Sequence, residues 1–354
     1  MCEGNHKLPG PCIQAFYLQW VKPIRAQARG LPEGVRTTSS AASVLGLQGG
    51  WRVVAYRRTL KRAVGCTGIG LHSGKSVRLE LRPAPAEHGI KFVRTDVGVE
   101  IPARIENLAR LDHATSLSHA GVSIDTVEHL LSALGALGVD DVAVHVDGPE
   151  LPILDGSSAP FVILIHEAGL RPLGVPRRYL KVVKPVEVVR GNKWVRLTPS
   201  DHLRVSYQIG FDHPLLRHQE LSVRVTPESF VEDLAPARTF GFLHEVEMLR
   251  RAGLALGGSL ENAVVIGEGG VLNKLRFEDE FVRHKILDLI GDMTLLGHPV
   301  IGHVEAHKAG HALHTAAAAA LHEDREAWML VTHPQLPVWS VRRQAGMLSL
   351  EPTS

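Results

Sequence analysis

The chain has 354 residues, of which 44% are hydrophobic and only 5% aromatic, and its net charge is +2. This length suits about two domains, whose cores we expect to be aliphatic. A nearly neutral chain argues against a nucleic-acid-binding protein, and no apolar run approaches the roughly 18–20 residues of a membrane-spanning helix.

The cysteines Cys2, Cys12 and Cys66 form no CxxC pair. This argues against a disulfide framework and against a cysteine-ligated zinc site. A reducing cytoplasm is the simplest location for such a chain. A metal site would therefore have to use Asp, Glu or some of the 20 histidines.

Residues 1–55 are rich in Gly, Pro, Ser, Ala and Arg and show no sustained period. We interpret them as an N-terminal extension outside the fold. It could be a disordered tail, a transit peptide or the product of an upstream start codon. A secretory signal is disfavoured, because no clean apolar core follows a basic start.

Ordered structure is predicted from about residue 57. A glycine-rich turn separates two strands within residues 59–84, and the second strand alternates at Val77, Leu79 and Leu81. Further strands are predicted at 141–146, 179–189, 193–199, 203–209 and 300–307. Helices are predicted at 126–138, 159–170, 238–251, 278–299 and 310–321, and a glycine-rich turn at 253–266.

The segment 171–178 is rich in Pro and Arg, and we interpret it as a domain boundary. In each half of the chain the strands come first and a pair of helices follows them. This order predicts an α+β fold of two related layers. The expected domains are residues 56–176 and 177–332. A C-terminal tail, 333–354, follows them.

The helix predicted at 278–299 carries an unusual polar stripe. His284, Asp288 and Asp292 are spaced four apart and share one face, with Lys285 beside them. An imidazole and a carboxylate one turn apart can bind the same metal ion. Taken alone, however, the stripe is more typical of a charged ladder facing solvent.

Glu128 and His129 open the helix predicted at 126–138. With Asp125 as N-cap, Glu128 would complete a capping box, and His129 alone is more typical of a half-buried, hydrogen-bonded histidine. His311 begins the last predicted helix, where it could simply be a polar residue near a helix end.

Together these residues indicate a catalytic metal site. His129, His284 and Asp288 make a two-histidine, one-carboxylate set, which leaves a position open for water on a zinc ion. Glu128 adjoins a ligand and could take a proton from that water. His311 could protonate a leaving group, with Asp292 orienting it, and Lys285 and Thr239 could stabilise an oxyanion.

Several long motifs resemble one family, the UDP-3-O-acyl-N-acetylglucosamine deacetylases, zinc hydrolases of lipid A (lipopolysaccharide) synthesis in Gram-negative bacteria. The resemblance runs from about residue 57 to about residue 330. The most specific motifs are TVEHLLSALGALG (126–138), LRFEDEFVRHKILDLIGD (275–292) and KAGHAL (308–313). Others are TLKRAVGCTGIGLHSGK (59–75), RPAPA (82–86), ELPILDGSSAPFV (150–162), ARTFGF (237–242) and GLALGGSLENAVV (253–265).

The resemblance implies a reaction and a mechanism. Water activated by zinc attacks the 2-acetamide carbonyl, releasing acetate and UDP-3-O-acyl-glucosamine. Glu128 is the general base, and protonated His311, oriented by Asp292, assists the intermediate and the leaving amine. Lys285 and Thr239 stabilise the oxyanion. Iron suits the same ligands as zinc.

The resemblance also implies two domains of like topology, each a helix pair layered on a sheet, with the active site between them. An insert near 253–282 would form a hydrophobic passage for the acyl chain. The candidate substrate-binding residues are Phe240, Leu254, Gly258, Ser259, Ala263, Val265 and, at the diphosphate, Lys308. The expected enzyme is a cytoplasmic monomer.

The chain departs from the family at residues 1–55, beyond about residue 334, and at His314, where the family often has Asn. Two alternatives remain open. The chain could act on another acylated sugar nucleotide, or it could be an inactive lipid-sugar-binding protein. Small residues at Gly258 and Ala263 favour the acyl substrate, and an intact set of Glu128, His311 and metal ligands favours an enzyme.

Overall fold

The computed structural model describes residues 55–109, 111, 114–213 and 216–332, together with the backbone of 339–344 and 347–352. The predicted extension therefore lies outside the described residues, except for residue 55. The side chains of the predicted tail lie outside them as well. From residue 55 onward the chain belongs to one unit.

A five-stranded sheet forms the first half of this unit, in the order β2-β3-β8-β4-β5. Strands β4 and β8 are parallel, and the other neighbours are antiparallel. The strands are β2 (Val64–Ile69), β3 (Ser76–Pro83), β4 (Ile90–Arg94), β5 (Val99–Pro102) and β8 (Val142–Val146). Val77, Leu79 and Leu81 are buried, so the alternation that predicted β3 marks its core face.

A seven-stranded sheet forms the second half. Its main path is β11-β12-β18-β10-β19, and β13 pairs with both β18 and β14. The strands are β10 (Tyr179–Val182), β11 (Val186–Arg190), β12 (Lys193–Thr198), β13 (Leu203–Ile209), β14 (Gln219–Arg224), β18 (Val300–His307) and β19 (Trp328–Val331). The single strand predicted at 179–189 is thus two strands. Pro185 lies in the break, where it has no N–H to donate to a ladder.

The remaining strands of the described residues form four smaller sheets. The segment predicted as a domain boundary forms β9 (Leu170–Pro176), which pairs with β1 (Tyr56–Leu60). The others contain β6 (Leu117–His119) and β7 (Val122–Ile124), then β15 (Phe240–Phe242), β16 (Val264–Gly267) and β17 (Gly270–Val271), and finally β20 (Trp339–Gln344) and β21 (Met347–Pro352).

In the part of the chain that the structure describes, the five longer helices are α2 (Glu128–Leu137), α3 (Ala159–Ala168), α5 (Leu243–Arg251), α6 (Glu280–Thr294) and α7 (His311–Glu323). Short helical turns are η1 (Ile105–Asn107), α4 (Pro227–Ser229) and η3 (Phe230–Leu234). The helix predicted from residue 238 begins only at Leu243. The preceding residues Phe240–Phe242 pair with β16 instead, so tertiary pairing overrides the local pattern.

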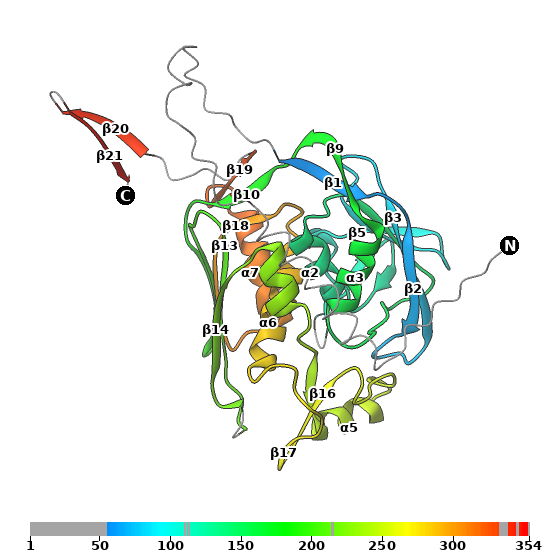
Figure 1. The fold of residues 1–354 in the computed structure, drawn as a ribbon. Helices are drawn as coiled ribbons and strands as arrows, with labels where there is room; N and C mark the ends of the chain where they lie inside the picture. The colour runs from blue at the N-terminus through cyan, green and yellow to red at the C-terminus, as the bar shows by residue number, and fades with distance from the viewer. Residues whose placement is uncertain are drawn as a thin grey trace, which may run out of the picture. The chain divides into compact units, whose positions relative to one another are not determined.

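The helices α2, α3, α6 and α7 lie between the two large sheets (Figure 1). Helix α7 packs on β11 and β12, α6 on β13 and β14, and α3 on β2. This layering confirms the predicted α+β class. Among the described residues, no helix combines the length and the apolar character that crossing a membrane would require.

Helices α2 and α6 approach each other closely at Gly291. A Cβ atom at this position would lie 2.2 Å from the carbonyl oxygen of Glu128. Only glycine allows the two backbones to come this close, and this explains a glycine within a helix despite its unfavourable propensity.

Replacing Gly291 by Ala should force α2 and α6 apart. We expect a loss of unfolding free energy of about 1–3 kcal/mol, the usual cost of overpacking, and a fall in activity. Chemical denaturation measures the first effect. Gly269→Ala is the matched control, because a Cβ there meets no atom within 4 Å. Equal stability of the two variants would contradict the argument.

Candidate active site

Helix α6 presents its polar stripe to the interior of the protein. His284 and Asp288 are each 2% exposed and Asp292 is fully buried. The alternative of a charge ladder facing solvent is therefore wrong. The residues are enclosed because α6 packs against α2, α7 and the β13–β14 hairpin on different sides.

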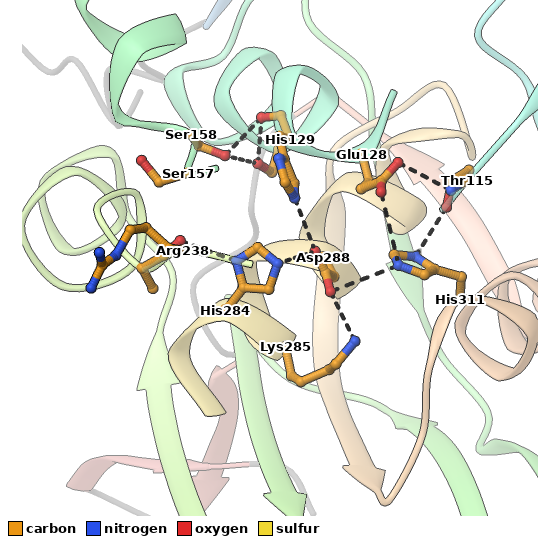
Figure 2. Close-up of polar contacts among 12 residues, drawn as sticks. Thr115, Glu128, His129, Ser157, Ser158, Arg238, His284, Lys285, Asp288 and His311 are labelled. Carbon is orange, nitrogen blue, oxygen red and sulfur yellow. Dashed lines mark hydrogen bonds and ion pairs between the residues drawn. The ribbon is translucent and has the colours of Figure 1, made fainter. Parts of the chain in front are cut away.

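Two histidines from different helices meet one carboxylate of α6. The Nε2 atoms of His129 and His284 lie 3.6 and 3.2 Å from Oδ1 of Asp288. Ligand atoms of the three residues all lie within 4.8 Å of one another. Figure 2 shows both imidazoles pointing towards Asp288, His129 from α2 and His284 from α6. The structure thus brings together the three predicted metal ligands.

The chemistry of this cluster fits a cation. Oδ1 of Asp288 is buried and has no hydrogen-bond partner, an arrangement that is costly for a carboxylate unless a positive charge lies beside it. The Nδ1–H of His284 donates to the carbonyl oxygen of Ala237 at 3.0 Å, which leaves Nε2 as the free ligand atom. Burial lowers the pKa of His284 to about 4, so its ring is neutral, as metal binding requires.

Asp288 remains ionised in this setting. Burial by itself would raise its pKa, but His284 and Lys285 hold the pKa of this carboxyl well below its usual range. Nζ of Lys285 donates to Oδ2 of Asp288 at 3.0 Å. One carboxylate oxygen is therefore engaged by an ammonium group, and the other is left for a metal.

Glu128 faces the same cavity instead of capping its helix. The N-cap of α2 is Val127, with no side-chain cap, and Oε2 of Glu128 accepts a hydrogen bond from the backbone N–H of Thr115 at 3.1 Å. The capping box with Asp125 is therefore wrong. The preceding Thr126 has a positive φ of 62°, a strained conformation, and this irregular entry leaves no N-cap role for Asp125.

His311 is held by hydrogen bonds at one ring nitrogen and faces the cavity with the other. Nδ1 lies 3.0 Å from Oδ2 of Asp292 and 3.1 Å from the hydroxyl of Thr115. Nε2 lies 3.9 Å from Oε1 of Glu128 and 3.8 Å from Oδ2 of Asp288. The predicted orienting contact between Asp292 and His311 is present in the structure.

The protonation states of these groups follow from their surroundings. Burial alone would lower the pKa of His311, but the carboxylates, Asp292 foremost, raise it to about 9. Burial raises the pKa of Glu128 above its ordinary value. A protonated imidazole and a buried carboxylate thus stand side by side at the cavity.

A second His/Asp cluster is present at Asp292, His311 and His314. Here both carboxylate oxygens of Asp292 are already satisfied. Oδ1 accepts from the Thr115 hydroxyl at 2.5 Å, and Oδ2 accepts from His311 and His314 at 3.0 and 2.9 Å. This cluster is a hydrogen-bonded network, whereas the one around Asp288 has an unsatisfied oxygen.

A cavity of about 600 Å³ is lined by the three predicted metal ligands and by Glu128 and His311, the predicted base and acid. Thr239, Phe240 and Lys285 line it, as predicted from the sequence. Arg190 and Lys193, at the turn between β11 and β12, also line this cavity, and they were not predicted from the sequence. In the sequence they are only two basic residues at a turn between strands, and their spacing matches no metal-binding or acid–base motif.

A second cavity of about 400 Å³ shares Leu71, Thr239 and Phe240 with the first, so the two adjoin. Its lining is largely apolar. It contains the predicted passage residues Gly258, Ser259, Ala263 and Val265. Leu254 is not among the lining residues. Nor does Lys308 line either cavity; its side chain packs on Gly210.

A buried ion pair joins the first residue of α6 to Arg238, in the segment that leads through Thr239 into β15. Nε of Arg238 donates to Oε1 of Glu280 at 2.8 Å, and Glu280 is fully buried. Nη2 of Arg238 also donates to the carbonyl oxygen of Lys274 at 2.7 Å. These bonds hold one wall of the cavity against α6, the helix that carries His284 and Asp288, two of the three predicted metal ligands.

A family model described as UDP-3-O-acyl N-acetylglycosamine deacetylase matches residues 57–323. The UDP-3-O-acyl-N-acetylglucosamine deacetylase of Syntrophotalea carbinolica is 49% identical over 280 residues, which cover 78% of this chain and 91% of that protein. The enzyme of the same name from Acidithiobacillus ferrooxidans is 47% identical over 285 residues, with coverages of 79% and 94%. That from Myxococcus xanthus is 49% identical over 279 residues, with coverages of 78% and 89%.

The two clusters on α6 make opposite predictions for metal content. Asp288→Ala should abolish tight metal binding, because it removes the unsatisfied oxygen. Asp292→Asn should retain the metal, because Asp292 is engaged by hydrogen bonds. Elemental analysis of the purified variants, with about one ion per wild-type chain expected, measures this. Metal retained in the first variant and lost in the second would reverse the assignment.

Proposed function

This chain belongs to the UDP-3-O-acyl N-acetylglycosamine deacetylase family, and from that membership we propose how its own residues carry out the reaction. The family consists of metalloenzymes that act in lipid A biosynthesis. The chain removes the N-acetyl group of UDP-3-O-acyl-N-acetylglucosamine by hydrolysis. Water adds to the acetamide carbonyl, the C–N bond breaks, and acetate and the free amine leave.

His129, His284 and Asp288 would hold the metal ion, which we propose to be zinc. The observation that carries this proposal is the buried, unpartnered Oδ1 of Asp288 between two imidazoles. A zinc ion there supplies Lewis acidity and lowers the pKa of water. The same ligands suit Fe²⁺, so metal analysis of protein from its native host decides between the two.

Glu128 is the proposed general base. Its carboxylate faces the cavity one residue from a proposed ligand, and the backbone N–H of Thr115 fixes Oε2. Since burial raises its pKa, the carboxylate is a better proton acceptor than a solvated glutamate. It takes the proton that water loses as the C–O bond forms.

His311 is the proposed acid. Asp292 keeps its Nδ1–H directed away from the cavity, so Nε2–H faces the reacting atoms. The protonated imidazole of His311 stabilises the tetrahedral intermediate and then donates a proton to the departing nitrogen. Lys285 and Thr239, which line the same cavity, are the proposed partners of the oxyanion.

The apolar cavity that adjoins this site is the proposed passage for the 3-O-acyl chain. Gly258, Ser259, Ala263 and Val265 are small lining residues that leave room for a hydrocarbon. Phe240 borders both cavities and would lie where sugar and chain join. Leu254 and Lys308 have weaker support, because neither lines these cavities.

The proposed site is complete within one chain, because every ligand and acid–base residue comes from it. We therefore propose a monomer.

The cytoplasm remains the proposed location, since Cys66, the cysteine among the described residues, is a free thiol. Sedimentation analysis and cell fractionation test these two points. The division at 171–178 into two domains also stays a proposal, tested by limited proteolysis.

Glu128→Gln preserves the shape of the side chain and removes the base. We expect turnover to fall by about 10²–10⁴, the usual contribution of an acid–base group. Acetate release measures turnover, and the metal content should stay at the wild-type level. Unchanged turnover with metal bound would remove Glu128 as the base.

Ala263→Leu should narrow the passage. We expect kcat/KM for a long-chain substrate to fall at least about 10-fold relative to that for a short-chain analogue, the scale on which a methylene-sized change acts in an apolar pocket. Leu254→Phe adds bulk outside the lining and is the control. Equal effects of the two variants on both substrates would contradict the passage.

Removal of residues 1–54 should leave acetate release and the melting temperature unchanged. The family match begins at residue 57, and the folded unit begins at Ala55. Steady-state kinetics and thermal unfolding of the shortened chain provide the measurement. An inactive or misfolded product would place the extension within the fold.

A further inference from the structure

His314 is a buried histidine on α7 that the mechanism above leaves without a role. It is fully buried, one turn after His311 on the same helix. Its Nδ1 lies 2.9 Å from Oδ2 of Asp292, the atom that also accepts from His311. Its Nε2 lies 2.8 Å from the hydroxyl of Tyr207. Both ring nitrogens are therefore engaged.

The direction of these bonds follows from the chemistry of the partners. An ionised Asp292 can only accept, so Nδ1 of His314 carries a hydrogen and donates it. In a neutral ring Nε2 is then an acceptor, and the hydroxyl of Tyr207 is a donor within reach. The same hydroxyl lies 2.8 Å from the carbonyl oxygen of Ala309, so its single proton has two acceptors within reach and is donated to one of them at a time.

These contacts connect three elements around His311. Tyr207 belongs to β13, Asp292 to α6, and His314 to α7. Ala309 lies just before α7, so the bonds reach both sides of His311 in the chain. Without the donor at His314, Oδ2 of Asp292 would lose one of its two imidazole partners, and only the Thr115 hydroxyl and His311 itself would hold the carboxylate in place.

We propose that His314 is a positioning residue: its Nδ1–H holds Asp292 in the orientation that keeps Nε2 of His311 directed at the reacting atoms. Tyr207 in turn fixes the ring of His314. The role rests on the proposed function of His311 as the acid. His314 itself touches no substrate, and it acts on the chemical step through Asp292.

Two substitutions test the contacts of the two ring nitrogens separately. In His314→Asn the amide nitrogen occupies the place of Nδ1, so the bond to Asp292 survives and the contact with Tyr207 is lost. In His314→Gln the terminal group reaches the place of Nε2, so Tyr207 keeps a partner and Asp292 loses its donor. The amides thus form a matched pair that differs in which contact remains.

We expect His314→Asn to keep a kcat close to the wild-type value. His314→Gln should lower kcat about 10- to 100-fold, the usual effect of losing an outer hydrogen-bond partner in a metal site, with KM and metal content unchanged. In an Asp292→Asn background the same Gln substitution should lower kcat little further, because the Asp292 carboxylate through which His314 acts has already been removed. Equal kcat for the two amide variants, or a full additional loss in that background, would overturn the proposal.

A failure of the proposed function can be distinguished from a failure of the inference about His314. A wild-type protein that releases no acetate from the UDP-linked substrate counts against the proposed function, whereas an active wild type with an unaffected His314→Gln counts against this inference alone. If His314→Gln does not fold, His314→Ala replaces it. This variant also removes the donor to Asp292, and it should lower kcat at unchanged KM relative to His314→Asn. Equal kcat for His314→Ala and His314→Asn would overturn the inference.

Discussion

The contact between α2 and α6 at Gly291 determines where the groups of the site lie. Because this residue has no Cβ, α6 can approach the carbonyl oxygen of Glu128 directly. That approach places His129 of α2 beside His284 and Asp288 of α6, and it leaves the side chain of Glu128 facing the same cavity. A wider separation of the helices would pull apart a cluster whose ligand atoms now lie within 4.8 Å.

Two aspartates one turn apart on α6 acquire different chemistry from their partners. Asp292 accepts from Thr115, His311 and His314 and is satisfied as an anion within the protein. Asp288 has Lys285 on one oxygen and no hydrogen-bond partner on the other. In a buried setting the first arrangement orients an imidazole, and the second calls for a cation. In the proposed mechanism, the helix therefore separates metal binding from proton transfer within one turn.

Much of the candidate site, but not all of it, could be predicted from the amino-acid sequence. Helical spacing placed His284, Asp288 and Asp292 on one face. Residue type and position at helix starts made Glu128, His129 and His311 candidates, and the resemblance to long family motifs gave the whole set a mechanism. Spacing alone misjudged the stripe as more typical of an exposed ladder, because exposure depends on what packs against a helix. The capping box failed for a related reason: the backbone N–H of Thr115, elsewhere in the chain, is the partner of Glu128.

By itself, the sequence determined the α+β class, the candidate ligands and the family, because periodicity and residue type are local properties and motifs can be matched without coordinates. Boundaries such as the late start of α5 depended on strand pairing between β15 and β16. Only the tertiary structure distinguished Asp288 from Asp292 and gave His314 its partners, since a hydrogen bond requires two groups at one point in space. Burial, which sets the pKa of His311 and of Glu128, likewise arises only when the layers pack.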